Sequence, residues 1–204
     1  MSPKLSPQFS GLPLGVKMCV LSAQEPIARR RREDILVYLA LARFRKRPQI
    51  SALPSTRQRD MRAFFGSYAK ACAEADDLLF KAGDAAAIDD ACGRSRVGKI
   101  LRDDLYVHRT ALDALEPILR IYEGCGPAHL GEVEGANIIK IHRRTGKPSY
   151  LVYPDFETDP HPALLRGVRL YIGIDLHRKQ MTVSLRKPNG DALLPRHRRK
   201  SFKP

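Results

Sequence analysis

The first half of the chain spaces its apolar residues three or four positions apart, as amphipathic helices do. Residues 55–80 show this pattern over the longest stretch, and Ser55 can cap its start, so we predict one long helix there. Residues 26–44 show it too. Their apolar positions are Ile35, Leu36, Leu39 and Ala42. Pro26 suits a first helical turn, but the four arginines at 29–32 oppose the helix dipole, which places the start of regular helix near Glu33.

Two shorter helices are predicted next. Gly83 and Asp84 end the long helix and begin a short one over residues 84–95. Residues 111–122 form the second, and residues 123–126 are expected to end it because they contain two glycines.

Beyond residue 136 the period changes from about 3.6 to 2, which is typical of strands. Residues 137–142 and 149–153 are β-rich and joined by "RRTGKP", where Gly146 suits a positive φ, so a hairpin is predicted. Residues 169–176 and 181–185 are further strands. The turn signal "PNGD" predicts that residues 181–185 pair with residues 192–194. Asp159 is expected to cap a helical turn in "DPHPALL". The predicted fold class is α+β, with helices first and then a small, mostly antiparallel sheet.

Composition adds a basic character to this picture. The chain has 204 residues, a net charge of +14 and no tryptophan, and 7% of its residues are aromatic. So few aromatic residues disfavour a stacking platform for single-stranded nucleic acid. The positive charge suits a polyanionic partner such as DNA, although a solvated basic surface without a partner is the plain alternative. Residues 168–204 concentrate this charge, with ten Lys or Arg against two Asp.

The four cysteines, at 19, 72, 92 and 125, form no C-x-x-C pair, so neither a zinc knuckle nor a redox motif is indicated. Reduced cysteines in helical segments predict a cytoplasmic protein. The longest apolar run, at 35–42, is too short to span a bilayer, and no signal peptide is evident, so a membrane partner is not expected.

Several stretches between residues 26 and 168 resemble the C-terminal region of a bacterial family associated with DNA phosphorothioation and classed as methyltransferases. The resemblance is carried by "RREDILVYLALARF", "MRAFFGSYAKACAEADDLLFKAGD", "VGKILRDDLYVHRTALDALEPILRIYEGC", "GEVEGANIIKIHR" and "SYLVYPDFETDPHPALL". In that family an upstream domain would bind S-adenosylmethionine through a strand and a glycine-rich turn. The glycines near this N-terminus, Gly11 and Gly15, lie in a Pro-broken stretch, so we expect the catalytic domain to be absent and no cofactor to bind.

Residues 169–194, "RLYIGIDLHRKQMTVSLRKPNGDALL", resemble instead the start of DEDD-class insertion-sequence transposases. In those Mg²⁺-dependent nucleases the first strand ends in a metal-binding Asp, which Asp175 matches, and a hairpin follows. Two-metal chemistry needs several carboxylates that hold two ions about 4 Å apart. Only Asp191 follows Asp175, so Asp175 alone is not expected to cut DNA.

These two resemblances divide the chain into three parts. Residues 1–25, rich in Pro, Ser and Gly, are predicted to be a disordered lead-in. Residues 26–168 form a helical and β-hairpin accessory domain, and residues 169–204 a transposase-like strand and hairpin with a basic tail. Because main-chain pairing needs only an extended segment, residues 169–176 are expected to pair beside residues 149–153.

Candidate nucleic-acid contacts come from two places in the chain. His108 and Arg109 are expected to meet His142, Arg143 and Arg144 around a phosphate, if the hairpin packs over the helices. Lys140 is expected to point outward between two isoleucines, with Tyr150 and Tyr153 beside it across the hairpin. These three side chains would form a contact face for nucleic acid or simply pack against one another across the strands. Basic clusters at residues 29–32, 43–47 and 196–200 offer further phosphate contacts or are simply solvated.

Candidate metal ligands are Asp155, Asp159 and His161, which lie close together in sequence, and Asp175. The alternative is that Asp155, Asp159 and His161 are ordinary loop residues and that Asp159 caps the following helical turn.

The function expected from the sequence is a truncated, catalytically inactive accessory domain that binds DNA or a protein of a DNA-modification system. A DEDD transposase fragment and a small metal-dependent enzyme using Asp155, Asp159 and His161 are the alternatives.

Overall fold

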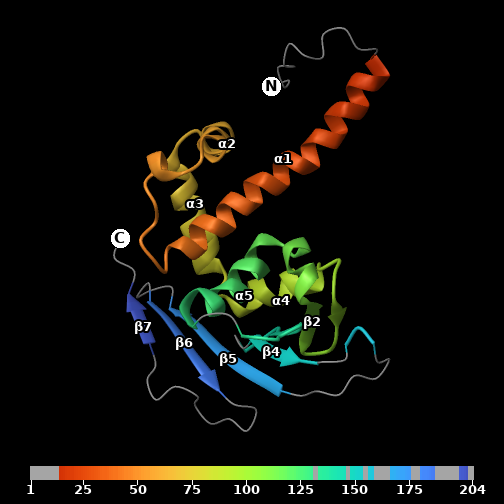
Figure 1. Cartoon of the computed structure of the whole chain (residues 1–204), viewed down its shortest axis with the longest axis vertical. Helices are drawn as coiled ribbons and strands as arrows, with labels where there is room; N and C mark the ends of the chain where they lie inside the picture. Colours follow the sequence, from red (N-terminus) through yellow and green to blue (C-terminus); the bar gives the residue numbers. More distant parts are fainter. Residues whose placement is uncertain are drawn as a thin grey trace.

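The computed structural model describes residues 14–130, 133–145, 148–153, 156–158, 166–175, 180–186 and 198–201. Within these, it describes the side chains of residues 25–128, 133–145, 148–153 and 156–158. The fold is α+β, with helices in the N-terminal part and an antiparallel sheet after them, as predicted (Figure 1). The α-helices are α1 (Leu14–Ala42), α2 (Ser55–Phe65), α3 (Tyr68–Lys81), α4 (Ala85–Gly93) and α5 (Pro117–Leu130). The 3₁₀ helices are η2 (Ile50–Ala52) and η3 (Arg109–Ala114). The strands are β1 (Lys99–Ile100), β2 (Asp104–His108), β3 (Ile138–His142), β4 (Pro148–Val152), β5 (Arg166–Asp175), β6 (Gln180–Arg186) and β7 (Arg198–Ser201).

The first helix is longer than predicted. It begins at Leu14, so the prediction of a disordered lead-in is wrong for residues 14–25, and residues 1–13 lie outside the described part. Pro26 is inside the helix rather than in its first turn. The arginines at 29–32 therefore lie mid-helix, where Arg29 and Arg30 form i,i+4 ion pairs with Glu33 (3.8 Å) and Asp34 (3.4 Å).

The long helix predicted over residues 55–80 is in fact two helices. Gly66 adopts φ 75° and its N–H donates to the carbonyl of Arg62, which ends α2. Ser67 then caps α3 by accepting a hydrogen bond from the N–H of Lys70. Glycine takes positive φ without strain and serine is a preferred N-cap, so the Gly-Ser pair overrides the continuous apolar spacing.

The shorter helices follow the prediction in part. Asp84 caps α4 through a hydrogen bond to the N–H of Ala86, as expected. The helix predicted over 111–122 begins instead as η3 and resumes as α5, which continues through Gly124 and Pro127. Gly124 permits a close approach there, because a Cβ at that position would lie 2.6 Å from the Cδ1 of Leu41. The glycines expected to stop the helix thus serve helix packing.

The described strands form one antiparallel sheet in the order β1 to β7. The hairpin of β3 and β4 is confirmed. β5 does pair with β4, but through residues 166–169, so of the segment 169–176 that was expected to pair there only Arg169 does so, and residues 169–175 pair with β6 instead. The partner of β6 is β7 rather than residues 192–194, which corrects the predicted third strand and places part of the basic tail in the sheet. Gly146, the "PNG" turn and the turn capped by Asp159 lie outside the described residues.

The core lies between the helices and one face of β2, β3 and β4 (Figure 1). Leu105, Ile139 and Ile141 are fully buried on that face, and they alternate with half-buried residues on the other. Other large, fully buried side chains are Leu39, Phe44, Met61, Leu79, Ile88, Leu119 and Ile121. Each contributes roughly 1.5–3 kcal/mol through removal of apolar surface from water. Among the described residues, none of the helices has the length and apolarity needed to cross a bilayer.

Candidate functional site: a cavity beside a basic surface

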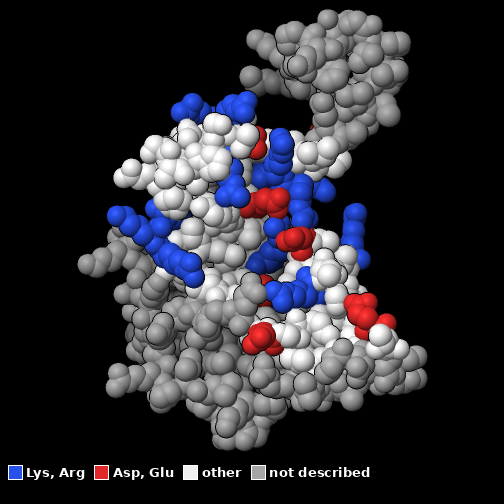
Figure 2. Space-filling model, in the orientation of Figure 1, with Lys and Arg blue, Asp and Glu red and all other residues white. Residues whose placement is uncertain are grey.

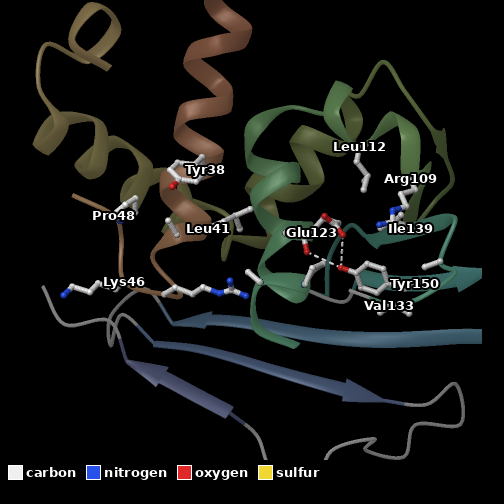
Figure 3. A pocket seen from close by; sticks show the side chains of 16 residues that line it. Tyr38, Leu41, Lys46, Pro48, Arg109, Leu112, Glu123, Val133, Ile139 and Tyr150 are labelled. Carbon is white, nitrogen blue, oxygen red and sulfur yellow. Dashed lines mark hydrogen bonds between the residues drawn. The ribbon is translucent and has the colours of Figure 1, made fainter. Parts of the chain in front are cut away.

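A cavity of about 600 Å³ lies where the end of α1 meets η3, α5 and the β3–β4 hairpin. Its apolar walls include Leu41, Pro48, Leu112, Pro127, Val133 and Ile139, and Tyr38 adds an aromatic ring. Figure 3 shows Tyr38 and Leu41 on the α1 side, with Arg109, Leu112 and Ile139 across from them. Arg45, Lys46, Arg109 and Glu123 supply charge to this otherwise apolar wall.

Glu123 and Tyr150 form the polar centre of the cavity. The Tyr150 hydroxyl donates to Glu123 Oε1 at 3.0 Å and lies 3.2 Å from the Glu123 carbonyl oxygen (Figure 3). Tyr150 stands opposite Ile139 in the hairpin, so it shares the buried face of the sheet and reaches α5. Burial, together with the charge of Glu123, raises the pKa of Tyr150 well above its usual value. The phenol therefore stays a hydrogen-bond donor at neutral pH, which fixes the position of the carboxylate.

Next to this cavity lies what we call the basic surface: Arg45, Lys46, Arg57, Arg59 and Arg62. All five side chains are exposed. Arg45 and Lys46 follow the end of α1 and also line the cavity, while the other three lie on α2. The Arg57 guanidinium stacks 4.8 Å from the ring centre of Tyr38, which connects α2 to the cavity wall. In Figure 2, Lys and Arg side chains lie over α2 and beside the end of α1.

The cations of the basic surface differ from several cations elsewhere in the fold that a carboxylate neutralises. Among the described side chains, Arg45, Lys46, Arg59 and Arg62 have no acidic partner. The paired cations are Arg32 with Glu74, Arg47 with Asp76, Arg94 with Glu116 and Asp90, Arg120 with Asp34, Lys140 with Asp104, and Arg143 with Asp89. Unpaired exposed cations keep their charge available for an anionic partner.

The structure does not bring the predicted phosphate cluster together. Asp104 stands opposite His142 and Ile138 opposite His108, so the two histidines lie at opposite ends of the β2–β3 pair. Four residues of strand separate such positions by about 13 Å. His108 stacks on Phe156 at 5.2 Å between ring centres, and its Nδ1 lies 2.8 Å from Thr110 Oγ1. Arg109 instead lines the cavity.

At the other end of that strand pair, Arg143 is held inside the fold. Its Nε lies 2.6 Å from Asp89 Oδ1, and its Nη1 donates to the carbonyl oxygen of Arg102 at 3.3 Å. Asp89 belongs to α4, so this ion pair ties the hairpin to a helix. Arg144, next in sequence, is exposed.

Lys140 does lie on the face of the hairpin that points away from the helices. Its Nζ is 2.8 Å from Asp104 and 5.4 Å from the ring centre of Tyr106. Partial burial opposes the charged form, but Asp104 and Tyr106 together hold the pKa of Lys140 above its ordinary value. The expected flanking role of Tyr150 is wrong because Tyr150 is on the opposite face, and Tyr153 instead hydrogen-bonds Asn137 through its backbone.

The predicted metal ligands are placed only in part. Asp155, Asp159 and His161 lie outside the described residues. Asp175 is the last residue of β5, at the strand end where the sequence predicted it. Within the described residues, no group of three or more His, Cys, Asp or Glu side chains could hold a metal ion.

Two of the described cysteines, Cys92 and Cys125, are fully buried, whereas Cys72 is half-buried, and all three are free thiols. Burial raises the pKa of Cys92 to about 11 and also raises that of Cys125. Since the thiolate is the reactive form, burial disfavours nucleophilic chemistry at Cys92 and Cys125.

Sequence reasoning found only part of this site. Arg45 and Lys46 belong to the basic cluster 43–47 that was expected to offer phosphate contacts. The cavity was missed because Glu123 and Tyr150 are 27 residues apart and meet only through packing. Arg59 and Arg62 were missed although "RQRDMRAFF" places Arg59 on the side of the helix away from Met61 and Phe65, with Arg62 next to it.

Comparison of the chain with models of protein families, with curated proteins and with solved structures found no match.

Proposed function

We propose that this chain is a non-catalytic DNA-binding accessory domain, which holds DNA through its basic surface for a protein of a DNA-modification system. The observation that carries the proposal is the group of four exposed cations, Arg45, Lys46, Arg59 and Arg62, without an acidic partner among the described side chains. Cations arranged in this way attract the phosphate backbone and release its bound counterions. Phosphate contacts of this kind position DNA without reading its base sequence, so the proposed contact is mainly with the backbone.

The link to DNA modification comes from the sequence resemblance to proteins associated with DNA phosphorothioation. The transposase-like segment adds a strand to the same sheet through β5, which suits an architectural role for that segment. A fragment of a DEDD transposase remains the alternative, and it requires Mg²⁺-dependent nicking of DNA that is lost in Asp175→Ala.

The test is a DNA-binding titration with two variants that lose the same charge. The basic-surface variant changes Arg45, Lys46, Arg59 and Arg62 to Gln. The control variant changes four other exposed cations, Arg96, Lys99, Arg102 and Arg144, to Gln. At about 50 mM salt we expect the basic-surface variant to lose on the order of 100-fold in affinity, and each lost contact to lower the slope of log K against log salt by about 0.9.

The control variant distinguishes a located surface from general charge attraction. It should retain affinity within about 3-fold, because its cations lie away from the proposed contact. Equal losses in both variants would show that only total charge matters, and the proposed binding surface would then be rejected.

A further inference from the structure

The cavity at the end of α1 has the size and lining of a site for a small organic molecule. Its volume of about 600 Å³ lies within the range of small-molecule sites, and mostly apolar walls are typical of them. Its aliphatic and aromatic wall includes Tyr38, Leu41, Pro48, Leu112 and Ile139 (Figure 3). A hydrocarbon body placed here would remove this wall from water, which is favourable.

Two charged groups inside the cavity already have partners within the protein. The Glu123 carboxylate accepts a hydrogen bond from Tyr150, and both Glu123 and Arg109 take part in further interactions within the fold. Burying a polar group beside a hydrocarbon is most costly when that group has no partner. A ligand therefore need not supply a partner for either residue, and the apolar wall decides what fills the cavity.

Arg45 and Lys46 supply the polar end of the site. Both side chains line the cavity and are exposed, so they lie where it meets solvent. Neither has an acidic partner among the described side chains, so an anionic group placed there would meet two available cations. A neutral apolar molecule would leave both cations unused. The ligand that suits both ends has a hydrocarbon body and one carboxylate.

We propose that this cavity binds a hydrophobic carboxylate, with its hydrocarbon body against the apolar wall and its charged group on Arg45 and Lys46. These two residues also belong to the basic surface, so the bound ligand competes for them with DNA phosphates. Tyr38 connects the two sites further, because its ring lines the cavity and stacks on Arg57. The ligand is thus an inhibitor of DNA binding, and this effect, unlike the cavity site itself, rests on the proposed function.

The first experiment is calorimetric titration of the full chain with decanoate, below its micelle concentration, and with 1-decanol, which has the same body without the charge. We expect one decanoate per chain. Changing Arg45 and Lys46 together to Gln should weaken decanoate about 5- to 10-fold, as loss of two exposed ion pairs allows, and leave 1-decanol within about 2-fold. The control changes Arg96 and Lys99 to Gln, two exposed cations outside the cavity, and should leave both ligands within about 2-fold.

A second variant tests occupancy of the cavity without changing any charge. Ala42 lines the cavity, so Ala42→Phe should fill part of it and abolish binding of decanoate and of 1-decanol. The matched control is Ala85→Phe, at an exposed residue of α4 outside the cavity, and it should change neither. Circular dichroism confirms that each variant is folded.

Three results would overturn the cavity site. They are the absence of saturable decanoate binding to the wild-type chain, wild-type affinity in folded Ala42→Phe, and equal loss of decanoate affinity in the two charge variants. Displacement of decanoate by butyrate at equal concentration would also overturn it, because butyrate has the charge but almost none of the hydrocarbon body.

Competition with DNA separates the failure of this inference from that of the proposed function. Saturating decanoate should weaken DNA binding about 3- to 10-fold at about 50 mM salt in the wild-type chain and not in Ala42→Phe. Decanoate that binds without weakening DNA binding would overturn the inhibitory effect. DNA binding that depends on Arg59 and Arg62, without decanoate binding, rejects the cavity site and leaves the DNA-binding surface. Decanoate binding that Ala42→Phe abolishes, with equal DNA affinity in the basic-surface variant and its control, supports the cavity site and rejects that surface.

Discussion

Two regions of this molecule carry the same kinds of side chain and use them differently. On the β2–β3 pair, Lys140 and Arg143 each lie within 2.8 Å of a carboxylate oxygen, from Asp104 and Asp89 respectively. On α2, Arg59 and Arg62 are exposed and have no acidic partner among the described side chains. The paired cations hold the fold together, whereas the unpaired ones remain free to bind. Residue type alone therefore does not distinguish a structural cation from one available to a ligand.

Among the substitutions that test this comparison, Arg143→Gln is expected to change the free energy of unfolding most. In Arg143→Gln, the Asp89 carboxylate loses its charged partner and the link from β3 to α4 is broken. Removing one member of a buried pair costs about 3–5 kcal/mol, and partial exposure of these groups reduces this to about 2 kcal/mol. Urea denaturation measures that loss. Retention of full stability would show that the ion pair is not structural.

The same variant also tests the DNA hypothesis for Arg143. DNA affinity, measured well below the unfolding temperature, should stay within about 3-fold of wild type. The charge of Arg143 is already neutralised by Asp89, so its removal should take little attraction away from a phosphate. A large loss of affinity in the folded variant would restore Arg143 as a DNA contact.

Lys140 should show a smaller effect with a defined pH dependence. Lys140→Met keeps the side chain's length but removes the pair with Asp104, at a cost of about 1 kcal/mol for a partly exposed pair. The pKa of Lys140 is higher in the folded state than its ordinary 10.5, so the folded state retains the proton longer. The stabilisation is thus complete below pH 10.5 and is lost as pH rises through the folded pKa.

The measurement for Lys140 is the difference in unfolding free energy between wild type and Lys140→Met at several pH values. The difference should be constant from neutral pH to about pH 10 and narrow above 10.5. Asp104→Asn in the Lys140→Met background should then cost little more, because the partner is already gone. A difference that grows above pH 10.5 would contradict the assigned sign.

Much of the fold could be predicted from local patterns, and the failures have identifiable physical causes. Alternation predicted the β3–β4 hairpin correctly. The next strand was predicted in the right place in the sheet but with the wrong register, because extended pairing alone does not fix which residues stand opposite each other. The break at Gly66 was missed because two helices with matching apolar spacing look like one, and the apolar rows of α2 and α3 pack into the same core. The continuation of α5 through Gly124 was missed because close packing against Leu41 favours a glycine inside that helix, which overrides its low helix propensity.

The candidate site was less predictable than the fold for a different reason. Arg143 looked like a phosphate ligand because its partner, Asp89, is 54 residues away in the chain and meets it only in three dimensions. Glu123 and Tyr150 gave no local signal either. Arg59 and Arg62 could have been selected, since their neighbours on the same helix define which side is buried. Charge type can be read from sequence, whereas charge pairing requires the tertiary fold.

The smallest expected effect is that of the basic-surface variant on stability. Its four substitutions remove charges that make no ion pair within the described part of the chain, so each should change the unfolding free energy by less than about 0.5 kcal/mol. A small gain is expected at low salt, because the chain carries a net charge of +14 and neutralisation relieves self-repulsion. Thermal denaturation at low and high salt measures both points, and the gain should vanish when salt screens the charges. A marked loss of stability would mean that these arginines and Lys46 support the fold as Arg143 does, and the contrast between the two regions would not hold.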